Sequence, residues 1–284
     1  MHVQALGICR FSYPSELAAF KVKHESLEVR RAALYDPQRL NRRMFYFEQC
    51  LIPSLKAQTD PEFTFLVLIG EQLPAEFRSR LEAAIAGCAA IRIVVVPEGR
   101  NVTDVSREAL LAARDRSAET VAEFRIDDDD AVAVDFIARS KLTFEGLSMT
   151  LLENERQFCV DFIQGFCAVA KPDRVELTPV ATRYWSCAMT RYLRPGNPKC
   201  ALDFHHRRVW RRMPTLTVPK PHMFIRGSHE FNDAGKKGDV FATQENTEPV
   251  LAAPAAREVL QDRFGIDHDA MQAAWHTHQR KYPV

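Results

Sequence analysis

Short apolar runs alternate with amphipathic segments along the first half of the chain. Apolar side chains dominate residues 2–9, 63–69, 90–96 and 121–126. Runs of this length and composition are typical of strands that are buried on both faces of a sheet. The pattern therefore predicts four buried strands before residue 130.

The segments between these runs have helical periodicity. Asp36 and Pro37 resemble an N-cap followed by a proline at the first helical position. Apolar side chains follow at spacings typical of a helix, at Leu40, Met44, Phe47, Leu51 and Leu55. We expect Pro53 to kink this helix, and further helices from Pro74 and over residues 104–117. Strands that alternate with helices predict an α/β fold with a mostly parallel sheet.

The second half of the chain is less regular and predicts a mixed arrangement. Residues 157–162 and 165–170 are expected to form strands, paired as a hairpin, and residues 199–212 a helix. Residues 213–250 are rich in Pro, Gly, Asn and Asp and predict long loops. Residues 254–280 predict C-terminal helices.

Composition narrows the function without identifying it. The 284 residues are 46% hydrophobic, with 38 basic and 37 acidic side chains, which is typical of a globular protein and argues against a nucleic-acid binder. The apolar stretch 83–96 falls short of the about 20 residues that span a bilayer, and the N-terminus lacks signal-peptide features. Seven cysteines without a C-x-x-C pair are expected to be free thiols. We therefore expect a cytoplasmic protein.

Four consecutive aspartates, Asp127 to Asp130, follow the fourth predicted strand. On extended backbone, Asp127 and Asp129 would face one side, and Asp128 and Asp130 the other. Ligands of open α/β sheets bind at the carboxyl ends of the strands, and carboxylate oxygens suit Mg²⁺ or Mn²⁺. The alternative is a solvated acidic turn that caps a helix beginning near Ala131.

These residues also carry a family resemblance. The segment from Glu123 to Val132 is similar to the D-x-D region of GT-A nucleotide-sugar glycosyltransferases. The ordered set of motifs resembles a bacterial rhamnosyltransferase family over roughly residues 3–240. The motifs are Cys9–Ser12, the block from Arg42 through Leu55 with Gln58–Asp60, the acidic run, and His229–Asn232.

The resemblance implies a GT-A-like fold and a domain organisation. A single catalytic domain would cover residues 1–250, followed by a C-terminal helical extension, 251–284. Within it, residues 1–130 would form the nucleotide-sugar-binding half and residues 131–250 the acceptor-side half. The implied reaction is metal-dependent transfer of a sugar, by resemblance rhamnose, from a nucleoside-diphosphate donor to a glycan or lipid-linked acceptor.

In such enzymes, Mn²⁺ or Mg²⁺ bridges the D-x-D carboxylates and the donor diphosphate, and so stabilises the leaving group. By resemblance, Asp129 would be a metal ligand, with Asp130 as the fallback and His229 as a further ligand. His222 is the second choice for the histidine. Asp127 and Asp128 would belong to the donor-binding region, with Asp127 facing the ribose or the metal.

Two arginines complete the predicted donor site. Arg10 follows the first strand and could bind a phosphate, or form a surface ion pair. Arg125 is expected to pair with an aspartate and so position the acidic loop. The catalytic base is less evident: Asp161 and Asp203 are candidates for an inverting reaction. A retaining reaction would need neither.

Residues 183–226 contain ten basic side chains and one acidic residue, Asp203. Arg207, Arg208, Arg211 and Arg212 would share one helical face. This segment could bind the diphosphate, an anionic or lipid-linked acceptor, or the inner membrane face, or it could be a solvated surface.

Two other classes of function remain open from the sequence. Asp128-x-Asp130-x-Val132 fits the D-x-D-x-[TV] pattern of haloacid-dehalogenase-type phosphatases. A non-catalytic protein that binds anions or membranes would use the basic segment alone.

Overall fold

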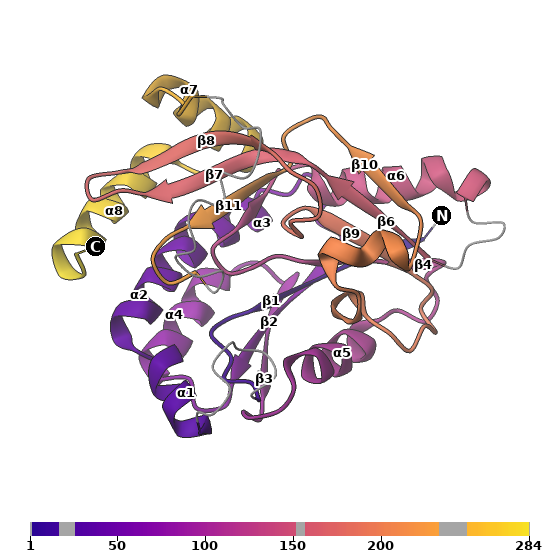
Figure 1. The fold of residues 1–284 in the computed structure, drawn as a ribbon, viewed down its shortest axis with the longest axis horizontal. Coiled ribbons are helices and arrows are strands. Elements are labelled where there is room, and N and C mark those ends of the chain that lie inside the picture. Colours follow the sequence, from indigo (N-terminus) through magenta and orange to yellow (C-terminus); the bar gives the residue numbers. More distant parts are fainter. Residues whose placement is uncertain (1, 17–25, 152–156, 233–248, 284) are drawn as a thin grey trace.

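The computed structural model describes residues 2–16, 26–151, 157–232 and 249–283. Its centre is a seven-stranded sheet with helices on both faces (Figure 1). From edge to edge, the strands are β10 (Thr215–Val218), β6 (Gln157–Phe162), β9 (Met189–Leu193), β4 (Thr120–Arg125), β1 (Val3–Arg10), β2 (Phe63–Gly70) and β3 (Ile91–Val96).

The strands of this sheet are mostly parallel. β1 pairs in parallel with both β2 and β4, β2 with β3, and β10 with β6. β9 runs antiparallel to its neighbours β4 and β6, and is the one described strand of the sheet that does so. The α/β architecture with a mostly parallel sheet and a mixed C-terminal half is therefore confirmed.

β1 is buried on both faces, as its apolar sequence predicts. Ala5 and Cys9 belong to a large core that includes α2 (Pro37–Tyr46) and α4 (Ala75–Ile85), whereas Leu6 and Ile8 contact a second core with α5 (Val102–Ala113). β3 differs, because it lies at the edge of the sheet: two of its six residues are exposed, three are half-buried and Ile91 alone is buried. The prediction that β3 is buried on both faces is wrong for this reason.

The helix predicted after Asp36 begins as expected, since the Asp36 carboxylate accepts a hydrogen bond from the backbone N–H of Arg39 at 2.9 Å. Before Pro53, this helix changes from α-helical to π-helical geometry. The π-helical segment, η2 (Phe47–Leu51), separates α2 from α3 (Ile52–Lys56). The remaining helices are α1 (Leu27–Leu34), α6 (Phe136–Leu151), α7 (Ala253–Glu258), the π-helical η5 (Val259–Arg263) and α8 (His268–Lys281).

A smaller four-stranded sheet lies beside the main one, in the order β5 (Ala131–Val132), β11 (Phe224–Ser228), β7 (Gln164–Ala170) and β8 (Val175–Ala181) (Figure 1). β6 pairs within the main sheet and β7 within the smaller one. The predicted hairpin is therefore wrong: Ile163 alone separates the strands, too little for a hairpin turn, and the chain passes from one sheet to the other there.

The basic segment also differs from expectation. Instead of one helix over 199–212, it forms two 3₁₀ helices, η3 (Ala201–Asp203) and η4 (His206–Arg211). With about three residues per turn, Arg208 and Arg211 lie one above the other, so the α-helical face that we expected does not form. None of the described helices is both long and apolar enough to cross a membrane.

Candidate functional site

A pocket of about 260 Å³ opens at the carboxyl ends of β1 and β4. These strands are parallel neighbours, and Ile8 pairs with Arg125, so Arg10 and the acidic run emerge at the same edge of the sheet. We call this cavity the site pocket. Its lining residues are Arg10, Ser12, Tyr13, Leu34, Arg39, Arg43, Arg125, Asp127, Asp129, Asp130, Arg226 and Asn232.

The acidic run forms a tight turn, in which the backbone N–H of Asp130 donates to the carbonyl of Asp127 at 3.1 Å. The alternation that we expected for extended backbone is therefore wrong. Three of the four carboxylates line the site pocket, and Asp128 alone of the four points away into the protein. The alternative of a helix cap is also wrong, because Ala131 and Val132 form β5 and α6 begins only at Phe136.

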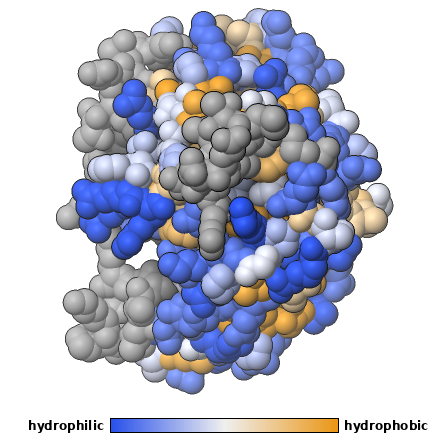
Figure 2. All heavy atoms as spheres, turned by 90° about the vertical axis from the view of Figure 1, so that its right-hand side faces the viewer, coloured by the Kyte–Doolittle hydropathy of each residue, from blue (hydrophilic) through white to orange (hydrophobic). Residues whose placement is uncertain are grey.

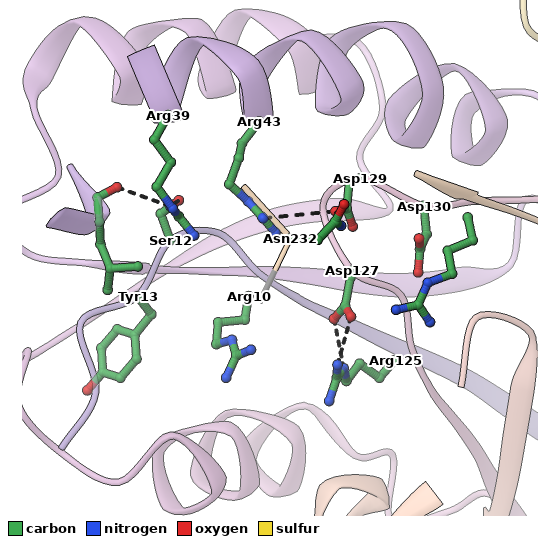
Figure 3. Close-up of a pocket in the computed structure, with 12 residues that line it drawn as sticks. Arg10, Ser12, Tyr13, Arg39, Arg43, Arg125, Asp127, Asp129, Asp130 and Asn232 are labelled. Atoms are coloured by element: carbon green, nitrogen blue, oxygen red, sulfur yellow. Dashed lines mark hydrogen bonds and ion pairs between the residues drawn. The ribbon is translucent and has the colours of Figure 1, made fainter. Parts of the chain in front are cut away.

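Arg125 and Asp127 form a two-pronged ion pair at the pocket wall (Figure 3). Arg125 donates from Nε to Oδ1 at 2.8 Å and from Nη2 to Oδ2 at 2.7 Å. Burial alone would raise the pKa of Asp127, but the charge and hydrogen bonds of Arg125, together with the charges of Arg10 and Arg43, hold this pKa below its usual range. Asp127 is therefore ionised and already has a cationic partner, the pairing that the sequence predicts for Arg125.

Asp128 is fully buried and is bound by Arg43 of α2. Arg43 donates from Nε to Oδ2 at 2.6 Å and from Nη2 to Oδ1. Burial raises the pKa of Asp128 even against the charge of Arg43. A haloacid-dehalogenase-type phosphatase would need this carboxylate to attack a phosphate, so its enclosure argues against that alternative.

Asp129 is held from the loop that follows β11. Asn232 donates from Nδ2 to Asp129 Oδ2 at 2.6 Å, and His229 Nε2 lies 3.1 Å from the same oxygen. Arg43 and His229 together hold the pKa of Asp129 low although burial alone would raise it. The loop comes this close because Gly227 has no side chain; a Cβ there would lie 2.3 Å from the carbonyl oxygen of Asp129.

The geometry of His229 assigns its proton. The backbone N–H of Phe231 donates to Nδ1 at 3.2 Å, so Nδ1 acts as an acceptor and Nε2 carries the hydrogen that is shared with Asp129. Tyr46 of α2 stacks on the imidazole with ring centroids 4.9 Å apart, and the side chain is fully buried. His229 therefore lies behind Asp129 as a hydrogen-bond donor.

Asp130 is bound by the backbone of β11. Its Oδ1 accepts a hydrogen bond from the backbone N–H of Gly227 at 3.2 Å. Burial and the charge of Asp129 raise the pKa of Asp130 well above its usual value, despite the nearby Arg226. Asp130 thus favours its neutral form.

Three arginines of the site pocket, Arg39, Arg43 and Arg226, are not among the residues that the sequence predicts for the donor site. Arg39 and Arg43 descend from α2 on one side, whereas Arg10 and Arg125 lie on the opposite side (Figure 3). The apolar periodicity of the segment that forms α2 predicts a helix, but it gives no indication that the arginines of this helix face a pocket. The sequence feature that could have indicated them is the density of basic side chains, since α2 has three arginines within five residues and no acidic residue in its first turn. The third missed residue, Arg226, was counted only as part of the basic segment.

Both predicted bases lie outside the site pocket. Asp161 accepts a hydrogen bond from the backbone N–H of Tyr184 at 2.7 Å, and burial raises its pKa to about 6. Asp203 pairs with Arg107 of α5 and accepts from the backbone N–H of Cys200 at 2.8 Å. Both contacts are structural, and a role of either carboxylate as base stays a prediction.

The second-choice histidine is also remote from the acidic run. His222 stacks on Phe166 with ring centroids 4.6 Å apart, and its carbonyl accepts a hydrogen bond from Arg263. Arg207, Arg208, Arg211 and Arg212 are exposed on and just after η4. Figure 2 shows the right-hand side of the molecule in Figure 1, where hydrophilic side chains cover most of the described surface.

The predicted divalent cation can be tested against this arrangement. Within the described ranges, no group of three or more His, Cys, Asp or Glu side chains lies close enough together to hold a metal ion without a ligand's help. Asp127 and Asp128 are each bound by a guanidinium group, and His229 offers a hydrogen to Asp129 instead of a lone pair. The described side chains therefore form no preformed site for Mn²⁺ or Mg²⁺.

Comparison with known proteins identifies the family. The family model described as "Putative rhamnosyl transferase" matches residues 4–239. No curated protein matches the sequence.

Among solved structures, S. aureus TarS 1-349 is similar at 10% identity and a TM-score of 0.45, over 79% of this chain and 60% of that chain. Its complex with UDP-GlcNAc is similar at 9% identity and a TM-score of 0.42, over 82% of this chain and 60% of that chain. A structure titled as a putative glucose-1-phosphate thymidylyltransferase from Bacillus anthracis gives 7% identity and a TM-score of 0.39, over 78% and 88%. This chain thus spans about 60% of the TarS 1-349 length.

Proposed function

Because this chain belongs to the family described as "Putative rhamnosyl transferase", we propose that it transfers a rhamnosyl group from a nucleoside-diphosphate donor bound in the site pocket. The acceptor is a glycan or a lipid-linked glycan. The family match covers both sides of the pocket, from β1 through the loop that follows β11.

The observation that carries this proposal is the excess of arginine in the site pocket. Five guanidinium groups line it beside three carboxylates, at the edge of the sheet where α/β proteins bind nucleotides. Charge-assisted hydrogen bonds from arginine suit phosphate oxygens, often in pairs. The same groups would stabilise the negative charge that grows on the diphosphate as the glycosidic bond breaks.

The exposed basic segment supports the second half of the proposal. Four arginines surround Trp210, whose side chain is 52% exposed. Arg211 lies over the Trp210 ring, 5.0 Å from its centroid. An exposed aromatic ring among cationic side chains suits an anionic membrane surface, where lipid-linked acceptors reside. We propose that this surface, formed by Arg207, Arg208, Trp210, Arg211 and Arg212, docks at the inner membrane face.

A thermal-shift experiment tests the donor assignment. UDP, dTDP and GDP are each added to the protein, with the corresponding nucleosides as controls without phosphate. A ligand that binds only the folded state at 100 times its Kd stabilises it by about 2.7 kcal/mol. We expect one diphosphate to raise the melting temperature while its nucleoside does not. If no diphosphate raises it, with or without Mn²⁺, the proposed function is wrong.

A further inference from the structure

The geometry points to a donor site in which arginine side chains, instead of a divalent cation, neutralise the diphosphate. This inference rests on the proposed function and deepens it. It departs from the metal dependence that the D-x-D resemblance implies, so the two lead to opposite experimental outcomes.

Two of the four carboxylates in the acidic run, those of Asp127 and Asp128, are already neutralised by arginine. Arg125 binds both oxygens of Asp127 at 2.8 and 2.7 Å. Arg43 binds both oxygens of Asp128, and its Nη1 lies 3.9 Å from Asp129 Oδ2. A metal ion would have to displace these charge-assisted hydrogen bonds, which are among the strongest in proteins. Arg43 and Arg125 therefore supply the positive charge beside the acidic run that a bound cation would otherwise supply.

The remaining contacts of Asp129 also favour a site without a metal ion. Its Oδ2 accepts hydrogen bonds from Asn232, at 2.6 Å, and from His229, at 3.1 Å. A metal-binding histidine usually donates a hydrogen bond from the N–H of its second ring nitrogen. In His229, that nitrogen, Nδ1, instead accepts a hydrogen bond from the backbone N–H of Phe231. Ligation through Nε2 would place a hydrogen on Nδ1 and oppose that N–H. His229 is therefore built to hold Asp129 in place.

The guanidinium groups are held in position before any ligand binds. Arg39 donates from Nη1 to Ser12 Oγ at 2.8 Å and to the Leu34 carbonyl at 3.1 Å. Arg226 lies over the ring of Trp185, 4.9 Å from its centroid. Preorganised charges need little rearrangement when negative charge develops, which is what a bound cation would otherwise provide.

The loop between β8 and β9, which carries Trp185, has an unusual backbone. Tyr184 and Ser186, the two neighbours of Trp185, have positive φ angles of 62° and 77°. Residues other than glycine rarely adopt this region, so the backbone on both sides of Trp185 is conformationally costly. The ring that supports Arg226 thus belongs to a loop whose backbone has few alternative conformations.

The test is a calorimetric titration of the protein with UDP, dTDP and GDP, in buffer with EDTA and again with Mn²⁺ or Mg²⁺. The inference predicts that the preferred diphosphate binds in EDTA, with a Kd within about twofold of that measured with metal. Binding that requires the metal would overturn the inference while leaving the proposed function intact. If no diphosphate binds under either condition, both fail.

Two variants and a control locate the effect. Arg10→Gln and Arg226→Gln each remove one guanidinium group from the site pocket, and we expect each to weaken diphosphate binding in EDTA roughly tenfold to a hundredfold. Arg78→Gln removes an exposed arginine that pairs with Glu82 on α4 and should leave the affinity unchanged. Unchanged affinity in both pocket variants would overturn the inference.

A third variant reverses the metal response. Arg125→Gln releases Asp127 from its ion pair and leaves an unmatched carboxylate at the pocket wall. We expect diphosphate binding to this variant to be weak in EDTA and to recover at least tenfold when Mn²⁺ is added. The same lack of response to Mn²⁺ as in the wild type would contradict the idea that arginine stands in for a cation.

Discussion

Asn232 donates from its side-chain amide to the Asp129 carboxylate at 2.6 Å, across 103 positions of sequence. The same amide lies 3.3 Å from the carbonyl of Gly227, and the Asn232 side-chain oxygen accepts the N–H of His229 at 2.5 Å. Asn232 therefore fastens the loop after β11 to the acidic turn after β4. The position of Asp129 in the site pocket depends on this contact.

Replacement of Asn232 tests that dependence. Asn232→Ala leaves Asp129 with only His229 and Arg43, and we expect sugar transfer to fall roughly tenfold to a hundredfold. Asn232→Asp places a second carboxylate against Asp129 and should be at least as damaging, because like charges repel at this distance. Turnover at saturating donor is the measurement, with circular dichroism as the check on folding. Wild-type turnover in both variants would contradict this role.

The buried carboxylate of Asp161 predicts a pH dependence of stability. Burial raises its pKa from 3.8 to about 6 against the opposing N–H of Tyr184 and the charge of Arg191. Because the folded-state pKa is the higher one, the folded state binds more protons between these values, and stability falls as pH rises from about 4 to 6. Asp161→Asn removes this loss.

We therefore expect Asp161→Asn to unfold in urea much as the wild type does at pH 4. At pH 8 it should be more stable than the wild type by up to about 3 kcal/mol, since each pKa unit corresponds to about 1.4 kcal/mol. A stability difference that is the same at both pH values would show that burial of the ionised Asp161 has no such cost. Transfer activity of the variant also tests the predicted role of Asp161 as base.

Local pattern predicted most of the first half of the fold, because each of its strands and helices carries its own signal. The apolar runs at residues 2–9 and 63–69 and the cap at Asp36 lie where the structure has β1, β2 and α2. The acidic run was expected at the carboxyl end of a strand, and that place is confirmed by the pairing of β1 with β4.

The predictions that are wrong or incomplete concern features that depend on contacts between residues far apart in the sequence. β6 and β7 each look like a strand, but nothing local says that they join different sheets. Arg43 belongs to a helix whose amphipathic stripe is local, whereas its ion pair with Asp128 spans 85 positions. Val209 of the 3₁₀ helix η4 is likewise buried in a small core with Cys159 and Met189, which are distant in sequence.

The C-terminal helix α8 is expected to contribute strongly to stability through Trp275. This side chain is fully buried, donates from Nε1 to the Lys171 carbonyl at 2.8 Å, and lies under the guanidinium group of Arg42 at 4.4 Å. Trp275→Ala should lower the free energy of unfolding by about 3–5 kcal/mol. Trp275→Phe keeps a ring beneath Arg42 and should cost less. Urea unfolding measures both, and equal losses would argue against the contribution of the Arg42 contact.

Membrane docking predicts a charge-dependent association with vesicles. Each basic side chain near an anionic bilayer contributes about 1 kcal/mol. Replacement of Arg207, Arg208, Arg211 and Arg212 by Gln should therefore reduce binding to phosphatidylglycerol vesicles by more than tenfold at low salt. A matched control replaces four exposed arginines elsewhere, at Arg78, Arg116, Arg174 and Arg257. Equal loss in both variants, or no binding of the wild type, would contradict the assigned surface.

The most direct measurement is the release of nucleoside diphosphate from a panel of nucleotide sugars, with dTDP-, UDP- and GDP-linked rhamnose among them, as the rhamnosyl group passes to water. The assay runs in EDTA and in Mn²⁺ for the wild type, Arg10→Gln and Arg78→Gln. We predict that the wild type and Arg78→Gln release one diphosphate at similar rates in both buffers, and that Arg10→Gln releases it at least tenfold more slowly. If no nucleotide sugar yields its diphosphate, or if Arg10→Gln matches the wild type, the account of the site pocket as the donor site is contradicted.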